Sequence, residues 1–169
     1  MYERFNTLAR YAIGTGAQGI LFTCSAFGPC IEEVARAWPA IPVLKPNEAM
    51  IDEVAAFAAD GAPVGLIATF APTLASMPAE FPKSVHLVPM LADGALARVQ
   101  AGDAAGHDAR AVETARLLLA QGCRAIALAQ FSLARAAPAI VSALNVRLFT
   151  TVDSAAKRLR ERVEAAGQA

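Results

Sequence analysis

The chain has 169 residues, 56% of them hydrophobic, and its fifteen basic and fifteen acidic residues leave no net charge. That length suits one ordinary domain or two small lobes, and the balanced charge argues against a nucleic-acid-binding protein. No apolar stretch is long enough to span a membrane, and three cysteines are too few for a disulfide framework. We therefore expect a cytoplasmic protein that partners neither a membrane nor nucleic acid.

Helices and strands are predicted to alternate along the chain. The first part is expected to contain helices over residues 2–13, 29–38 and 47–59 and strands over 20–23, 41–44 and 64–69. A proline-rich loop with at most a short helix follows over 72–82. The remainder is expected to contain strands over 85–90, 125–129 and 146–149 and helices over 103–121, 138–144 and from Asp153 or Ser154 onward. This alternation predicts an α/β fold of parallel sheets with flanking helices.

A glycine motif near the N-terminus resembles a cofactor signature. Gly14-Thr-Gly16-Ala-Gln-Gly19 spells the dinucleotide fingerprint, which requires a strand before it and a helix after it. Here a predicted helix precedes the motif and a predicted strand follows, so the glycines are expected to form a turn. No cofactor is predicted, and because the cysteines lack zinc-ligand spacing, no metal is predicted either.

Cys24 is the residue that most strongly indicates chemistry. It follows a predicted strand and precedes Gly28-Pro29, which is typical of a helix start. A thiol at the carboxyl end of a strand, near a helix N-terminus, is favoured as thiolate by the helix dipole. Two alternatives remain open: a buried structural thiol, or a redox pair with Cys30, which requires the two sulfurs to lie within disulfide reach.

Polar groups at other predicted strand ends are candidate binding residues. Ser25 and Ala26 would offer backbone amides to a carboxylate, or form an ordinary strand-to-helix turn. Thr69, Gln130 and Ser132 follow predicted strands and could contact substrate, or simply cap turns and add loop polarity.

The two histidines are expected to have no catalytic role. His86 falls within an apolar run and is expected to be a core or edge histidine. His107 lies beside Asp108 at the start of a predicted long helix, where solvent exposure is expected.

Several segments, taken in order, resemble one family. They are Phe22-Thr-Cys24-Ser-Ala-Phe-Gly28-Pro, Ile41-Pro-Val-Leu, Asn47-Glu-Ala-Met, Gly65-Leu-Ile-Ala-Thr69, Gly122-Cys-Arg-Ala-Ile-Ala-Leu-Ala-Gln130-Phe-Ser132 and Val146-Arg-Leu-Phe. In this order they resemble the aspartate/glutamate/hydantoin racemase superfamily, which includes arylmalonate decarboxylase and maleate isomerase.

The resemblance implies two similar α/β lobes with the active site between them, here divided as residues 1–70 with 146–169 and residues 71–145. In such proteins one cysteine per lobe exchanges a proton at the α-carbon of a small carboxylate, without a cofactor. Carried onto this sequence, the resemblance makes Cys24 catalytic. It assigns substrate binding to Ser25, Ala26, Thr69, Gln130, Phe131 and Ser132.

Two departures from the family pattern shape the functional prediction. Gln130 stands where the second cysteine is expected, and the first β-α unit has no counterpart, so the first lobe is expected to be truncated at its N-terminus. We therefore expect a racemase-family enzyme with Cys24 as single acid/base. The alternatives are a decarboxylase of a malonate-type acid and a degenerate homologue that binds a carboxylate or a partner. An unpaired sheet edge would favour a homo-oligomer.

Overall fold

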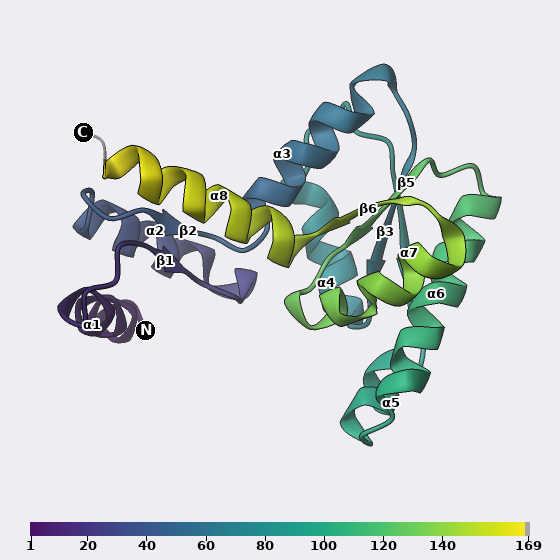
Figure 1. The fold of residues 1–169 in the computed structure, drawn as a ribbon, viewed down its shortest axis with the longest axis horizontal. Coiled ribbons are helices and arrows are strands. Elements are labelled where there is room, and N and C mark those ends of the chain that lie inside the picture. The colour runs from purple at the N-terminus through teal and green to yellow at the C-terminus, as the bar shows by residue number, and fades with distance from the viewer. Residues whose placement is uncertain (168–169) are drawn as a thin grey trace. The chain divides into compact units, whose positions relative to one another are not determined.

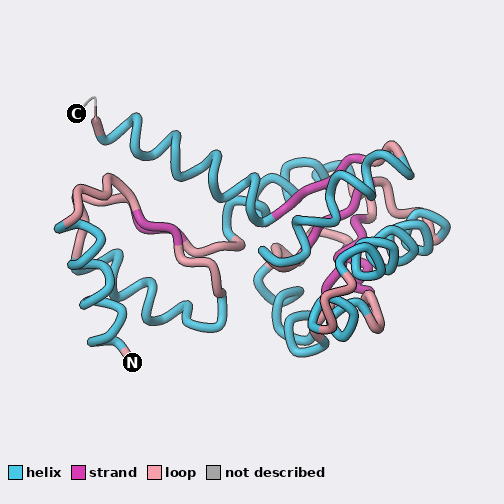
Figure 2. Tube along the Cα trace, turned by 60° about the horizontal axis from the view of Figure 1, so that its bottom comes forward, coloured by secondary structure: helices cyan, strands magenta, loops and turns pink. Residues whose placement is uncertain are grey.

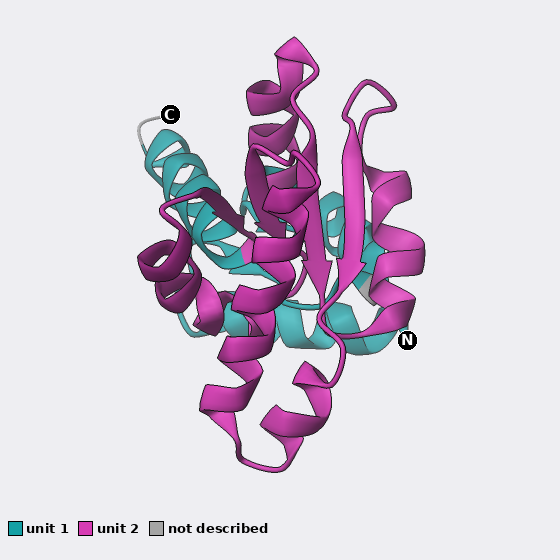
Figure 3. Ribbon diagram, turned by 90° about the vertical axis from the view of Figure 1, so that its right-hand side faces the viewer, with its two compact units in different colours: residues 1–49, 152–169 teal, residues 50–151 magenta. Residues whose placement is uncertain are grey.

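The computed structural model describes residues 1–167 and divides the chain into two compact units. Unit 1 joins Met1–Ala49 to the C-terminal segment that starts at Val152, and unit 2 is Met50–Thr151 (Figure 3). Both units contain parallel strands with flanking helices, which confirms the predicted fold class.

Unit 1 is built on a small parallel sheet. Its elements are α1 (Tyr2–Gly14), β1 (Ile20–Leu21), η1 (Ser25–Phe27), α2 (Gly28–Ala37), β2 (Val43–Leu44) and most of α8 (Thr151–Ala166) (Figure 1). β1 and β2 pair in parallel, with Ile20 opposite Val43. Both strands are shorter than the sequence predicts, although the Phe22 N–H still donates to the Leu44 carbonyl at 3.1 Å.

The glycine motif lies between α1 and β1, as its order of elements predicts. Gly16 has φ +91°, a left-handed conformation that glycine adopts without steric cost. Gly19 packs under α8, where an added Cβ would lie 2.9 Å from Leu159 Cδ1 and from Val163 Cγ2. The motif therefore forms a turn and a close packing contact.

Unit 2 contains a sheet of four parallel strands in the order β4-β3-β5-β6. Figure 2 draws the strands of both units in magenta. The elements of unit 2 are most of α3 (Glu48–Phe57), η2 (Ala58–Asp60), β3 (Val64–Ala68), α4 (Ala71–Ser76), η3 (Met77–Glu80), β4 (Leu87–Leu91), α5 (Ala95–Gln100), α6 (Ala104–Ala120), β5 (Ala125–Leu128), η4 (Phe131–Ala136), α7 (Ala137–Leu144) and β6 (Arg147–Thr150).

The sheet of unit 2 is covered on both faces, as parallel sheets require. Along β3, Leu66 points into a core with residues of α3 and η3, whereas Ile67 points into a second core with residues of α6 and α7. Every residue of β3 and β5 is buried, which explains why both strands are wholly apolar. These two central strands position the candidate site.

The structure also differs from the sequence predictions in the following elements. Residues 72–82 are mostly helical (α4 and η3), and α5 was not predicted. α8 begins at Thr151, before the predicted start at Asp153 or Ser154, so both residues lie inside its first turn. The predicted division placed β3 and β6 in the first lobe, whereas both strands pair with β5 in the sheet of unit 2.

Within residues 1–167, no helix is both long and apolar enough to cross a membrane.

Candidate functional site

The candidate site in unit 2 lies at the carboxyl edge of its sheet. Thr69 follows β3 and Gln130 follows β5, and these strands are neighbours. The backbone N–H of Thr69 donates to Gln130 Oε1 at 2.7 Å, and the Thr69 hydroxyl donates to the same oxygen at 3.0 Å. The strand order therefore brings together two residues that lie far apart in the sequence.

These hydrogen bonds fix the orientation of the Gln130 amide. A backbone N–H can only donate, so the atom that faces it must be the amide oxygen and not the nitrogen. Both hydrogen bonds use Oε1, and the two N–H groups of Nε2 are left to bind an acceptor. The residue thus presents donors, which match the acceptor-only oxygens of a carboxylate.

The topology is a second reason to treat this edge as a candidate ligand site. From β3 the chain continues to β4, on one side of the sheet, and from β5 it continues to β6, on the other side. Such a switch between neighbouring strands leaves a crevice at their carboxyl ends, where open α/β sheets bind ligands. Thr69 and Gln130 lie at this switch point.

The short helix η4 carries the remaining predicted residues of unit 2. Gln130 is its N-cap, the half-buried Phe131 is its first residue, and the exposed Ser132 is its second. Farther along η4, Arg135 donates from Nε to Asp108 Oδ1 at 3.0 Å and from Nη2 to Asp108 Oδ2 at 3.3 Å. The helix is therefore held at its start by Thr69 and near its end by Asp108.

A buried histidine completes this network, contrary to the prediction that it is exposed. His107 is only 1% exposed, and its Nδ1 lies 2.8 Å from Asp108 Oδ1. Because a carboxylate only accepts, Nδ1 carries the proton and donates it. Burial raises the pKa of the Asp108 carboxyl, but the hydrogen bonds from Arg135 and His107 outweigh burial and hold that pKa below its usual value.

Sequence reasoning missed this network because its members are separated. Arg135 meets Asp108 only after α6 and η4 pack together, and nothing in either segment predicts that packing. The adjacent His107-Asp108 pair was the one available signal. His86, expected in the core or at a strand edge, is exposed just before β4.

The predicted residues of unit 1 surround Cys24. Cys24 is exposed, has extended backbone (φ −131°), and is the N-cap of the short helix η1. Ser25 is the exposed first residue of η1, and Ala26 is its second, with a side chain outside the described part of the structure. α2 begins only at Gly28, so η1 separates the thiol from the helix that the sequence placed next to it.

The other two thiols differ from Cys24 in burial. Cys30 is 6% exposed within α2, and Cys123 is 5% exposed just before β5, at the end of that strand opposite Gln130. Burial raises the pKa of the Cys123 thiol, which keeps it protonated. All three cysteines are free, and Cys24 alone is exposed.

Lys45, the residue that follows β2, is paired with two carboxylates. Lys45 Nζ lies 2.8 Å from Glu32 Oε1 and 2.9 Å from Glu48 Oε1. The hydrogen bond to Glu32, followed by that to Glu48, raises the pKa of Lys45, so its ammonium stays charged and paired.

The described residues contain no group of three or more His, Cys, Asp or Glu side chains that could hold a metal ion. Of the predicted site residues, the structure brings together Thr69, Gln130, Phe131 and Ser132 in unit 2, and Cys24, Ser25 and Ala26 in unit 1.

Comparisons with known proteins find glutamate racemases, both by sequence and by structure. A curated glutamate racemase from Stutzerimonas stutzeri (strain A1501) is 26% identical over 168 residues, covering 94% of this chain. The chain spans 63% of the length of that relative.

Two solved structures share the fold. The glutamate racemase of Francisella tularensis, solved with D-glutamate, matches with a TM-score of 0.65 at 18% identity over 98% of this chain and 65% of that chain. Isoform RacE1 of glutamate racemase from Bacillus anthracis matches with a TM-score of 0.67 at 12% identity over 99% of this chain and 67% of that chain.

The family assignment rests on a match that covers most of the sequence. The model of the Asp/Glu/hydantoin racemase family matches residues 5–159, a range that includes both Cys24 and the Thr69–Gln130 pair. The chain therefore belongs to the Asp/Glu/hydantoin racemase family.

Proposed function

We propose that this chain acts at the α-carbon of a small carboxylate, without a cofactor, and that Cys24 is its single acid/base. In this proposal the thiolate of Cys24 removes the α-proton and later returns it. Charge then builds up on the carboxylate oxygens, and positioned N–H and O–H donors stabilise it. We assign that stabilisation to Nε2 of Gln130 and the hydroxyl of Ser132, with the amides of Ser25 and Ala26 as further donors and Phe131 beside the substrate. Thr69 donates its N–H and O–H to Gln130 Oε1 and so holds Gln130 in place.

The orientation of Gln130 carries the proposal. A glutamine amide does not titrate at neutral pH, so this residue does not act as the acid/base. Its oxygen is held by two hydrogen bonds from Thr69, at 2.7 and 3.0 Å. The Nε2 donors are therefore positioned before substrate arrives, and donors fixed in this way need little reorganisation during reaction.

The burial of the three thiols supports a single acid/base. Cys24 is exposed, whereas Cys30 and Cys123 are buried, and burial raises the pKa of Cys123. A buried protonated thiol is a poor base because the thiolate is the reactive form. Proton transfer by a thiol is therefore assigned to Cys24 alone.

A lyase is the second candidate, and the same single exposed thiol favours it. In a malonate-type acid the bond between the α-carbon and one carboxyl breaks, and CO₂ leaves without the electron pair. The Cys24 thiol then delivers one proton to the resulting carbanion, so only one acid is needed. Two-base racemisation, by contrast, needs an acid and a base on opposite faces of the α-carbon.

Proton NMR in heavy water tests the proposal. The substrates are amino acids, beginning with glutamate because the named relatives are glutamate racemases, together with hydroxy acids and substituted malonates. We expect exchange of the α-proton, or loss of CO₂, with the unchanged chain and with the control Cys123→Ala. Both reactions should disappear in Cys24→Ala.

Two results would overturn the proposal. A folded chain that leaves every substrate unchanged would favour carboxylate binding without turnover, the third interpretation. Activity that persists in Cys24→Ala would remove the thiol from the mechanism.

Gln130→Met, which keeps the side-chain length and removes the donors, should raise KM for the carboxylate. An unchanged KM would refute the role of Nε2.

A further inference from the structure

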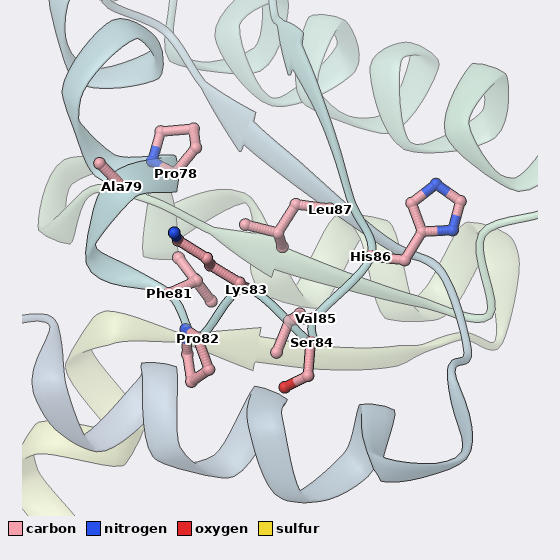
Figure 4. Close-up of a pocket in the computed structure, with 9 residues that line it drawn as sticks. All are labelled: Pro78, Ala79, Phe81, Pro82, Lys83, Ser84, Val85, His86 and Leu87. Carbon is pink, nitrogen blue, oxygen red and sulfur yellow. The ribbon is translucent and has the colours of Figure 1, made fainter.

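A cavity lies within unit 2, away from the Thr69–Gln130 edge. It has a volume of about 620 Å³ and is formed by residues 78–87 except Glu80 (Figure 4). These residues form η3 and the segment that leads into β4, so the cavity lies at the amino ends of the strands. A five-residue strand is roughly 16 Å long, so the cavity is well separated from the carboxyl edge of the sheet.

The walls of the cavity are fixed by turns and prolines. The Phe81 N–H donates to the Pro78 carbonyl at 3.3 Å, and the Val85 N–H donates to the Pro82 carbonyl at 3.0 Å. Proline restricts φ before folding, which favours such turns. The His86 carbonyl accepts from Val64 N–H at 2.9 Å, which joins the segment to the central strand β3. The cavity is therefore preformed.

Its floor is apolar and continuous with the core. Phe81 is 6% exposed and belongs to the core on the α3 face of the sheet, while Val85 and Leu87 are half-buried against that core. Each of these two side chains thus keeps part of its apolar surface open to the cavity. A ligand with an apolar body would bury that surface.

The charge of the lining is positive. No acidic residue lines the cavity, and Lys83 and Ser84 occupy the middle of the turn between Pro82 and Val85. In the described part of the chain, Lys83 has no carboxylate partner. Figure 4 shows its ammonium extending toward Pro78 and Ala79, beside the apolar side chains, while the His86 ring points away from them.

We propose that this cavity binds a small organic anion, with its apolar body against Phe81, Val85 and Leu87 and its anionic group paired with Lys83. The volume falls in the range of roughly 300–1,000 Å³ that is typical of small-molecule sites, which have apolar walls and a few polar groups. A carboxylate or a phosphate satisfies the same contact, since lysine acts on both as a point charge. The site is separate from the proposed function and does not depend on it.

NMR titration of the ¹⁵N-labelled chain tests this site. The probes are phenylpropionate and phenyl phosphate, which share an aromatic body and differ in the anionic group, with the uncharged phenylpropanol as the control ligand. We expect saturable shifts confined to residues 78–87 with at least one anion. Whichever anion binds more tightly identifies the head group.

Charge variants separate the cavity from general attraction. Lys83→Gln should weaken binding by about fivefold or more, because a partly exposed charged contact contributes on the order of 1 kcal/mol. Lys157→Gln, on the exposed surface of α8, should leave the affinity unchanged. Four results would each overturn the proposal. They are equal weakening by both variants, equal binding of phenylpropanol, shifts that occur only outside residues 78–87, and the absence of any shift.

Discussion

Replacement of Asp108 by alanine should destabilise unit 2 far more than loss of a surface ion pair would. Asp108 is the acceptor for the buried Nδ1–H of His107 at 2.8 Å and for the exposed guanidinium of Arg135. Without the carboxylate, the His107 donor remains in a 1% exposed position with no partner. An unsatisfied buried donor costs about 1–3 kcal/mol, and for a chain of this size each kcal/mol lowers Tm by roughly 2–4 °C.

The comparison with Arg135→Ala isolates that cost. This variant removes only the exposed half of the network and leaves the His107–Asp108 hydrogen bond intact, so its Tm should fall much less. Thermal unfolding should be followed by circular dichroism, because the single tryptophan, Trp38, lies in unit 1 and does not report on unit 2. Equal losses of Tm in the two variants would refute the argument that the buried donor dominates.

The pH dependence gives a second readout of the same carboxylate. The folded-state pKa of Asp108 lies below its ordinary value of 3.8, so the unfolded chain binds this proton more readily. The stabilisation is therefore fully present above that ordinary value and is lost as the pH falls through the folded pKa. The difference in Tm between the unchanged chain and Asp108→Asn should shrink as the pH is lowered from about 7 toward 3.

Three further changes test the packing, the helix cap and the thiols. Gly65→Ala would place a Cβ 2.7 Å from Leu118 Cδ1, inside a filled core. In urea titrations it should lower the free energy of unfolding by about 1–3 kcal/mol. An unchanged free energy would show that the core rearranges to accept the methyl group. Asp103→Ala removes the side chain that accepts from Gly106 N–H at 2.8 Å and caps α6, so Tm should fall, but less than for Gly65→Ala. Iodoacetamide at neutral pH should label Cys24 alone by mass spectrometry, because Cys30 and Cys123 are buried; early labelling of Cys123 would contradict its raised pKa.

The sequence predicted most elements, because their patterns are local. Helical periodicity predicted α1, for example, since apolar residues recur on one side of it. That pattern did not show whether the apolar side is covered: Ala9 is buried, whereas Leu8 is 60% exposed and Tyr2 is 53% exposed. Hydrophobic periodicity predicts the local secondary structure, whereas the burial of a side chain depends on which other elements pack against the helix.

Two predictions from the sequence are wrong, for different reasons. Residues 72–82 looked like a loop because of their prolines, but proline is tolerated in the first turn of a helix, and Pro72 and Pro78 lie there in α4 and η3. His107 looked exposed because it lies near a helix start with an acidic neighbour. Its burial depends on the elements that pack against α6, which the sequence around His107 does not encode.

The central position of the Thr69 and Gln130 strands follows from chemistry that the sequence contains. β4 includes Pro89, which has no N–H to donate and suits an edge strand, and β6 begins with the exposed Arg147. β3 and β5 are apolar throughout and buried on both faces, as only central strands are. Once β4 and β6 are placed at the edges, β3 and β5 must be neighbours, and the chain must leave them in opposite directions. The strand order that places Thr69 beside Gln130 therefore agrees with the residues that each strand contains.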